Sequence, residues 1–406
     1  MRICIVASDL EKSNQRLQPW RYLVETACML AQNGHEIQLL SDGLSRLLKN
    51  DFIEGLPVIR LASLQDWPLY PNQQVVKTIT NNMPDLVIWH LGLSSFFHLS
   101  TLKQIPYPVI CIFTSPIYNL HELTQLGTNK LLLGVRFSAV HLLGLLIPDW
   151  YIRRTIDKGL INNLVVESRT NNSRLLRKGI PASLVHVIRP GIDISWFTQK
   201  QLPHQSVKIR QDIGFSKEDI VVVFFGPPTP LRGLPTLLKA IAKVHAKDPR
   251  VKLLILSRQS ENEPLHDHFA IQKQMAQLDG HKWAHMATGF LSQEELIQMI
   301  GSSDIVALPF ELVPSDVPLS VLEAMALGVP VITTRVVCLP EMVPEEAGIC
   351  IQPSDLNALA EAIQSLAADP ELRHKLGNAG RMNALSWSDR DKNNGYWDLL
   401  LSQAIG

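Results

Sequence analysis

The chain has 406 residues, of which 46% are hydrophobic and 19% charged, and this composition excludes a disordered or fibrous protein. Its 38 basic residues balance 38 acidic residues, so the net charge does not indicate a nucleic-acid partner. The length allows two or three domains, each with its own core. The five cysteines are scattered and the amino end shows no signal-peptide pattern, which predicts reduced thiols in a cytoplasmic protein.

The first half of the chain alternates apolar strand patterns with helical patterns. The run "RICIVAS" predicts a buried strand near the amino end. A helical pattern over 19–34 follows it and ends at a glycine, Gly34. This alternation is typical of a doubly wound parallel sheet. Further strands are predicted at 35–41, 85–90, 109–113 and 164–167, and a further helical pattern at 173–179.

The second half repeats the alternation after a weakly periodic stretch, 193–206, within which we predict a hinge at 196–206. Strands are then predicted at 219–226, 251–257, 304–310 and 330–334, and helices at 234–246, 293–303 and 356–369. We therefore predict an α/β protein with two Rossmann-like domains, 1–195 and 207–386, facing each other across a cleft. The last helix, 387–406, is expected to pack back on the first domain.

The stretch "GPPTPLRGLPTLLKAI" is a candidate phosphate site. A strand ends at Gly226, a proline-rich turn follows, and Arg232 and Gly233 precede a helix with a proline in its first turn. A helix start presents N–H groups and a positive dipole, and Arg232 would add a cation that binds phosphate with two hydrogen bonds. The alternative is a solvated surface arginine in a loop.

The stretch "SDVPLSVLEAMALGVPVI" carries a carboxylate that has two interpretations. Ser320 and Glu323 fit the capping box, in which both side chains bond to the backbone at the helix start. In the functional interpretation, the amides of Leu319 and Ser320 face an anion, and Glu323 accepts hydrogen bonds from a ligand diol. The spacing leaves both interpretations open.

Together, "GPPTPLRG" and "LEAMALGVPVI" resemble the carboxyl-terminal domain of the retaining nucleotide-sugar glycosyltransferases of family 4, which have the GT-B fold of two Rossmann domains. Collinear blocks such as "PDLVIWH", "VHVIRPGIDISWF" and "ATGFLSQEELIQMIGSSDIVALPF" extend the resemblance over nearly the whole chain. The resemblance implies that Arg232 holds the donor diphosphate and that Glu323 binds the donor ribose. It also implies that the amides of Leu319 and Ser320 approach phosphate.

The chain departs from the family pattern at several positions. Pro227 replaces an arginine that would bind phosphate, and "SNQRLQPW" replaces a glycine-rich loop. The first glutamate of the family's paired-glutamate motif falls on Ser315, so we hypothesise that the adjacent Asp316 makes its contact with the donor sugar. The alternative for Asp316 is loop solvation or capping.

Three candidate residues lie in the first domain. His90 matches a family histidine at a strand end, although a histidine in that place is often structural. Thr114 and Ser115 stand where the family often has a His-Asp pair, and we take them as candidate substrate ligands.

The leading prediction is a glycosyltransferase that moves a sugar from a nucleoside diphosphate sugar to a glycan, lipid-linked or small-molecule acceptor with retention. The alternative is a catalytically weak glycosyltransferase-like binding or scaffold subunit. A Rossmann oxidoreductase is excluded because no Gly-x-Gly-x-x-Gly follows the first strand. We expect no metal and no cofactor, since no metal-ligand spacing or Asp-x-Asp motif is present. The oligomeric state is left open.

The longest apolar stretch, 131–150, raises the question of membrane contact. Arg136 and His141 interrupt it, which argues against a membrane-spanning helix. A buried helix or acceptor-pocket wall is one interpretation. The other is an interfacial helix at the inner face of the cell membrane, beside residues 151–189 with their eight Lys/Arg and two acidic residues. Flotation with anionic liposomes at low and high salt distinguishes the two.

Overall fold

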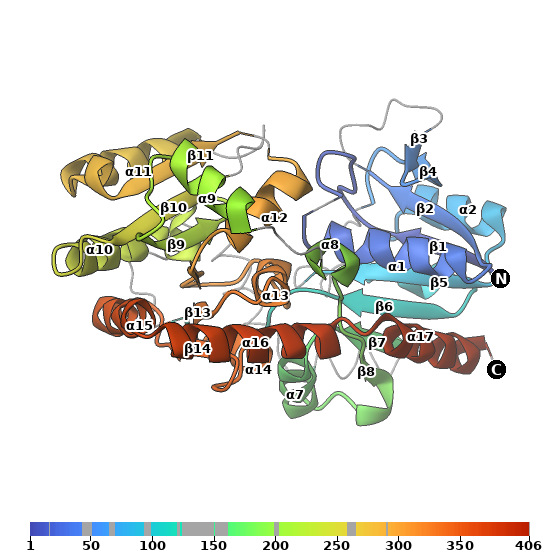
Figure 1. Ribbon diagram of the computed structural model, residues 1–406. Helices are drawn as coiled ribbons and strands as arrows, with labels where there is room; N and C mark the ends of the chain where they lie inside the picture. Colours follow the sequence, from blue (N-terminus) through green and yellow to red (C-terminus); the bar gives the residue numbers. More distant parts are fainter. Residues whose placement is uncertain are drawn as a thin grey trace.

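The computed structural model has two α/β lobes, each built on its own sheet (Figure 1). This confirms the predicted fold class of two Rossmann-like domains in the GT-B arrangement. The structure describes the following residues: 1–15, 17–42, 51–64, 70–92, 99–119, 122–123, 150, 161–198, 203–257, 265–289 and 291–405.

The described strands of the amino-terminal lobe form one sheet in the order β3-β4-β2-β1-β5-β6-β7-β8. All neighbours run parallel except β3 and β4, which form an antiparallel hairpin at one edge. The strands are β1 (Arg2–Val6), β2 (Glu36–Ser41), β3 (Asp51–Ile53), β4 (Leu56–Arg60), β5 (Leu86–Leu91), β6 (Val109–Phe113), β7 (Asn163–Val166) and β8 (Val185–Val187). The helices of this lobe are α1 (Trp20–Gln32), α2 (Gln73–Asn82) and α7 (Arg169–Arg177), with short 3₁₀ turns at Leu102–Gln104 and Ala182–Leu184.

The carboxyl-terminal lobe has a parallel sheet whose described strands run in the order β11-β10-β9-β12-β13-β14. The strands are β9 (Ile220–Phe225), β10 (Val251–Ser257), β11 (Ala284–Thr288), β12 (Ile305–Ala307), β13 (Val331–Thr334) and β14 (Gly348–Ile351). The helices are α9 (Pro203–Asp212), α10 (Leu234–His245), α11 (Leu265–Gln277), α12 (Gln293–Gly301), α13 (Leu319–Ala326), α14 (Leu339–Met342), α15 (Leu356–Ala368) and α16 (Pro370–Trp387), with 3₁₀ turns at Pro230–Arg232 and Gly280–Lys282.

Apolar periodicity explains how the carboxyl-terminal core assembles. Every residue of β9 is buried, as expected of a central strand covered on both faces. Helix α10 buries Leu234, Leu237, Leu238 and Ile241, which recur every three or four residues and therefore share one face. This packing fixes the start of α10 beside the end of β9, where the candidate phosphate site lies.

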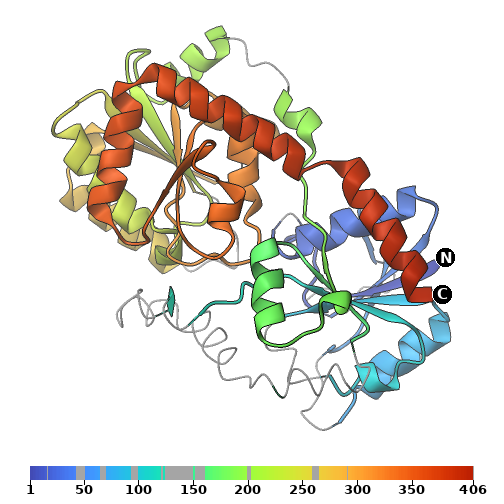
Figure 2. The same ribbon diagram turned by 90° about the horizontal axis from the view of Figure 1, so that it is seen from below.

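The chain passes between the lobes twice, and Figure 2 shows the second passage, where α16 leads into α17 (Arg390–Ile405). Helix α17 buries Trp397, Leu400 and Leu401 in the core of the amino-terminal lobe, beside residues of β1 and α1. The first passage includes α8 (Ile194–Thr198), so the predicted hinge at 196–206 contains the end of α8 and the start of α9.

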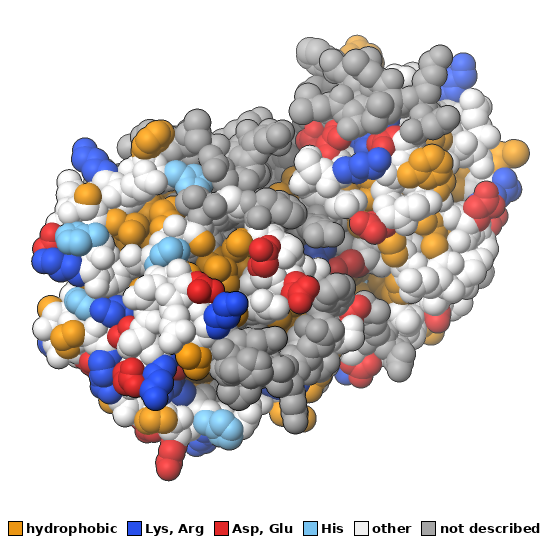
Figure 3. Space-filling model, turned by 45° about the horizontal axis from the view of Figure 1, so that its top comes forward, with side chains coloured by type: hydrophobic (Ala, Val, Ile, Leu, Met, Phe, Trp, Pro, Cys, Tyr) orange, Lys and Arg blue, Asp and Glu red, His pale blue; other side chains and the backbone are white. Residues whose placement is uncertain are grey.

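Most of the apolar stretch 131–150 lies outside the described residues, and only Trp150 at its end is placed, with an exposed side chain. No helix among the described residues is both long enough and apolar enough to cross a membrane. On the face drawn in Figure 3, basic and acidic side chains are interspersed and form no field of one sign.

Candidate active site

The turn between β9 and α10 is built around two glycines that no other residue replaces without strain. Gly226 has φ +114°, and a Cβ atom there would lie 2.3 Å from Nη1 of Arg232. Gly233 has φ +75°, and a Cβ there would lie 1.9 Å from the carbonyl oxygen of Pro309. The Arg232 guanidinium therefore lies directly over Gly226 at the end of β9, and its Cζ is 5.4 Å from the centre of the Phe310 ring. The turn thus brings a cation to the start of α10.

Helix α13 begins at Leu319, after Pro318, and has no side-chain hydrogen bond at its cap. The capping interpretation of Ser320 and Glu323 is therefore wrong. The Ser320 hydroxyl is buried and has no hydrogen-bond partner among the described residues. Leu319 and Ser320 nevertheless occupy the first turn, whose amides lack partners within a helix.

The Glu323 carboxylate contacts the other domain. Its Oε1 accepts a hydrogen bond of 2.7 Å from Nη1 of Arg21, on α1. Both side chains are largely buried, with exposed fractions of 16% for Glu323 and 18% for Arg21. The residues are 302 positions apart, so sequence spacing gave no indication of this pair.

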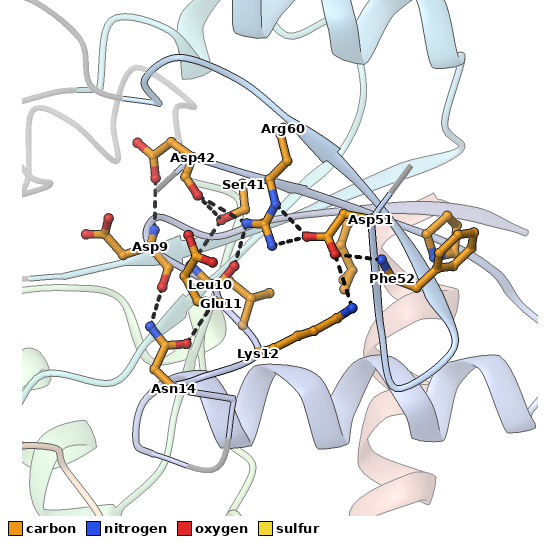
Figure 4. Close-up of polar contacts among 12 residues, drawn as sticks. Asp9, Leu10, Glu11, Lys12, Asn14, Ser41, Asp42, Asp51, Phe52 and Arg60 are labelled. Carbon is orange, nitrogen blue, oxygen red and sulfur yellow. Dashed lines mark hydrogen bonds and ion pairs between the residues drawn. The ribbon is translucent and has the colours of Figure 1, made fainter. Parts of the chain in front are cut away.

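A polar network holds the first part of the loop that precedes α1 (Figure 4). Asp42 Oδ1 accepts from the Asp9 amide at 2.8 Å, and Ser41 Oγ accepts from the Leu10 amide at 3.0 Å. Arg60 donates from Nε to Asp51 at 2.8 Å and from Nη1 to the carbonyl oxygen of Asp42 at 3.1 Å. The network ties the start of this loop to β2, β3 and β4.

A second set of candidate residues forms a polar cluster between the lobes. Asp316 is completely buried, and Ser168 Oγ donates to its Oδ1 at 2.8 Å. The Asp316 amide donates to the carbonyl oxygen of Thr114 at 2.7 Å, and the Thr114 hydroxyl lies 2.9 Å from Nε2 of His90. The carboxylate of Glu167, at the end of β7, accepts from the Val317 amide at 3.2 Å.

Burial perturbs the titration of this cluster. Burial is the main cause that raises the pKa of Asp316 to about 8, and the neighbouring carboxylate Glu341 adds to it. The hydrogen bond from Ser168 acts in the opposite direction and lowers this pKa. Burial and the charge of Asp316 raise the pKa of Glu167 well above its usual value. Burial lowers the pKa of His90 to about 4, so its imidazole is neutral at physiological pH. One Asp316 oxygen and one Glu167 oxygen have no partner among the described residues.

Apart from Leu319, Ser320 and Glu323 on α13, the predicted residues fall into two groups. The first contains Gly226, Arg232 and Gly233 at the start of α10, and the second joins His90, Thr114 and Asp316 between the lobes. In this structure the Asp316 carboxylate is enclosed by protein and faces Ser168, so its contact with a donor sugar stays a prediction. Ser115 contributes its carbonyl oxygen, which accepts from Nδ2 of Asn171 at 2.9 Å, within the amino-terminal lobe.

Sequence reasoning missed two contributors. Arg21 lies within a helical pattern, where nothing distinguishes it from a surface arginine. Glu167 carried a usable signal, since a carboxylate directly after a parallel strand lies at the edge of the sheet where ligands bind. Among the described residues, no three His, Cys, Asp or Glu side chains come together as metal ligands.

The described site combines features that suit a nucleotide with a phosphate group. A cation and a helix start lie at one end, and a carboxylate that can accept from a diol lies on α13. Arg21 of the other lobe contacts that carboxylate.

Two family models match the chain, one over each lobe. Residues 20–196 match the family described as Glycosyltransferase Family 4, and residues 205–383 match the family described as Glycosyl transferases group 1. A similar curated protein is the MMP alpha-(1->4)-mannosyltransferase of Mycolicibacterium hassiacum, 26% identical over 60% of this chain and 56% of that protein. Another is the D-inositol 3-phosphate glycosyltransferase of Corynebacterium glutamicum, 25% identical over 59% of this chain and 58% of that protein. The matched part of the chain thus spans little more than half the length of these relatives.

Solved structures match over nearly the whole chain. A glycosyltransferase from Rickettsia africae is 16% identical, with a TM-score of 0.74 and coverage of 100% of this chain and 98% of the other. Anabaena HepE in complex with UDP and glucose is 18% identical, with a TM-score of 0.72 and coverage of 99% of both chains. These structures share the fold, and the two family matches together span both lobes. The chain therefore belongs to the family 4 glycosyltransferases with the GT-B fold.

Proposed function

We propose that the protein is a glycosyltransferase that transfers a sugar from a nucleoside diphosphate sugar to a sugar or lipid-linked acceptor, with retention of configuration. The observation that carries the proposal is the Arg232 guanidinium packed over Gly226 at the start of α10. The named relatives are mannosyl- and inositol-phosphate glycosyltransferases, and HepE has been solved with UDP-glucose, which agrees with this donor class.

In this proposal the donor diphosphate lies between Arg232 and the amino end of α10. When the bond from the sugar to the diphosphate breaks, negative charge develops on the leaving oxygen. A fixed guanidinium and a helix dipole stabilise that charge without rearranging. Glu323 accepts hydrogen bonds from the ribose hydroxyls and so orients the nucleotide.

The acceptor side of the proposal involves the amino-terminal lobe. A neutral His90, held by its contact with Thr114, can orient an acceptor hydroxyl by hydrogen bonding but carries no positive charge. The leaving phosphate is the group that takes the acceptor proton in this mechanism, as the family resemblance implies. No protein base is therefore required.

A thermal-shift experiment with UDP, GDP and ADP tests the donor class. A ligand at about 100 times its Kd stabilises the folded protein by about 2.7 kcal/mol, so one of the three is expected to raise Tm. Arg232→Ala should abolish the rise. Arg250→Ala is the matched control, because Arg250 pairs with Asp248 at the surface, at the turn that follows α10, and its loss should leave the rise unchanged.

Turnover is then measured as release of the nucleoside diphosphate from UDP-glucose and GDP-mannose, with and without sugar acceptors. Release that depends on an acceptor and on Arg232 supports a glycosyltransferase. A flat thermal response to all three nucleotides would refute the nucleotide-sugar proposal. Nucleotide binding without any turnover over a broad acceptor panel would favour the weak binding subunit.

A further inference from the structure

The ion pair between Arg21 and Glu323 joins the two lobes at the carboxylate that we propose as the ribose ligand. Arg21 belongs to α1 of the amino-terminal lobe, and Glu323 to α13 of the carboxyl-terminal lobe. Their 2.7 Å hydrogen bond is charge-assisted and mostly shielded from solvent. Such bonds are about twice as strong as neutral ones. A ligand that binds Glu323 therefore contacts a group whose orientation depends on the other lobe.

Arg21 is held in place before any ligand arrives. Its Nε donates to Glu25, one turn further along α1, at 2.8 Å. On either side of it, Trp20 donates to the carbonyl oxygen of Ser8 at 2.8 Å and Tyr22 donates to the carbonyl oxygen of Ile188 at 3.0 Å. The first turn of α1 is therefore anchored on both sides, and the Arg21 side chain loses little further freedom in holding Glu323.

The pair leaves acceptor capacity for a ligand. Arg21 uses Oε1 of Glu323, and no described residue donates to Oε2. An ionised carboxylate has about four lone-pair sites on its two oxygens, so one arginine contact still leaves room for two hydroxyl donors. Burial alone would lower the pKa of Arg21, but the charges of Glu323 and Glu25 raise it, so the guanidinium stays charged.

We propose that Arg21 is a positioning residue for donor recognition: it holds the Glu323 carboxylate from the opposite lobe with Oε2 presented to the ribose diol. The inference rests on the proposed function of Glu323 as ribose ligand. Its consequence is that ribose recognition draws on both lobes, although Arg21 itself touches no part of the substrate. Loss of Arg21 should then weaken only those ligands that have ribose hydroxyls.

Calorimetric titration tests this selectivity. Wild-type protein, Arg21→Ala and Arg189→Ala are titrated with whichever nucleoside diphosphate binds best and with its 2′,3′-dideoxy analogue. Arg189→Ala is the matched control, because Arg189 donates to Glu341 across the same two lobes at 2.9 Å with comparable burial. Arg21→Ala should weaken the ribonucleotide about tenfold, equivalent to about 1.4 kcal/mol. It should change the affinity of the dideoxy analogue less than twofold, and Arg189→Ala should leave the affinity of both ligands unchanged.

Other outcomes overturn the inference in distinguishable ways. Tighter ribonucleotide binding by Arg21→Ala would mean that Arg21 competes with the ribose for Glu323. Equal losses for both ligands would mean that Arg21 acts on the phosphates or on the fold. Glu323→Gln should weaken the ribonucleotide and be non-additive with Arg21→Ala, and additive losses would also refute the positioning role. If wild-type protein binds no nucleoside diphosphate, the proposed function fails, and this inference fails with it.

Discussion

Replacing Asp316 with asparagine should make the free energy of unfolding less dependent on pH. Asp316 is completely buried between the lobes, and its pKa is raised from 3.8 to about 8, chiefly by burial. The folded protein therefore holds a proton on this carboxyl that the unfolded chain releases above its own pKa of about 3.9. Because the unfolded state binds fewer protons in this range, the free energy of unfolding falls as pH rises from about 4 to about 8.

The size of the effect follows from the proton balance. When the folded state holds one more proton than the unfolded state, the free energy of unfolding falls by about 1.4 kcal/mol for each unit that pH rises. Asparagine is similar in shape, can accept the Ser168 hydrogen bond and does not titrate. Between pH 5 and pH 7, the free energy of unfolding of wild type should therefore fall by about 2.7 kcal/mol relative to that of Asp316→Asn.

Urea unfolding followed by tryptophan fluorescence at pH 5, 6, 7 and 8 measures this change in the stability difference. Glu167→Gln serves as the companion variant, because burial and the charge of Asp316 also raise the pKa of Glu167, and it should reduce the pH slope in the same direction. Parallel curves for wild type and Asp316→Asn would show that Asp316 is ionised in the folded protein. That result would refute the argument from burial.

Three further substitutions test the fold. Gly233→Ala should lower the free energy of unfolding by about 3 kcal/mol or more in a urea titration, because its Cβ would collide with the Pro309 carbonyl at positive φ. Gly34→Ala is the control, since Gly34 also has positive φ but lies in open space, and it should cost about 1 kcal/mol. Equal losses would contradict the collision. Asp51→Asn should destabilise by about 3 kcal/mol at pH 7 by leaving the buried Arg60 guanidinium without its carboxylate partner. Burial alone would raise the pKa of Asp51 but Arg60 lowers it, so the wild-type advantage should shrink as pH falls below about 4 in the same assay, and a constant advantage would contradict the pairing. Trp397→Ala should cost about 3–5 kcal/mol, and exposed Tyr396→Ala under 1 kcal/mol, in thermal unfolding, and similar costs would mean that α17 does not dock as described.

The fold was predictable where burial imposes a simple pattern. Strands β6 and β10 match their predicted ranges residue for residue, because a strand covered on both faces is a mostly apolar run. The hairpin of β3 and β4 was missed because its strands are short and lie at the sheet edge. Helix α16 was missed because Gly377 weakens the helical pattern. That glycine is needed for close contact with the turn that follows α13, since a Cβ there would lie 2.1 Å from the carbonyl oxygen of Gly328.

The candidate site was predictable only within each lobe. The turn from Gly226 to Gly233 is local, so its glycines and its arginine could be recognised from spacing. The partner of Glu323 could not be, because the contact depends on how the two lobes are placed relative to each other. For the same reason, nothing in the sequence indicated that Asp316 is enclosed between the lobes, as the structure shows.

The two passages of the chain between the lobes touch each other, and this contact limits how the lobes can move. Ser388 Oγ accepts from the Ile192 amide at 3.2 Å, and a Cβ added to Gly191 would lie 3.3 Å from the Ser388 Cα. Because two adjacent segments connect the lobes, a hinge rotation about one axis is permitted, whereas sliding or twisting of one lobe against the other is resisted. A rotation that opens the lobes would then separate Arg21 from Glu323 and Ser168 from Asp316 in the same movement.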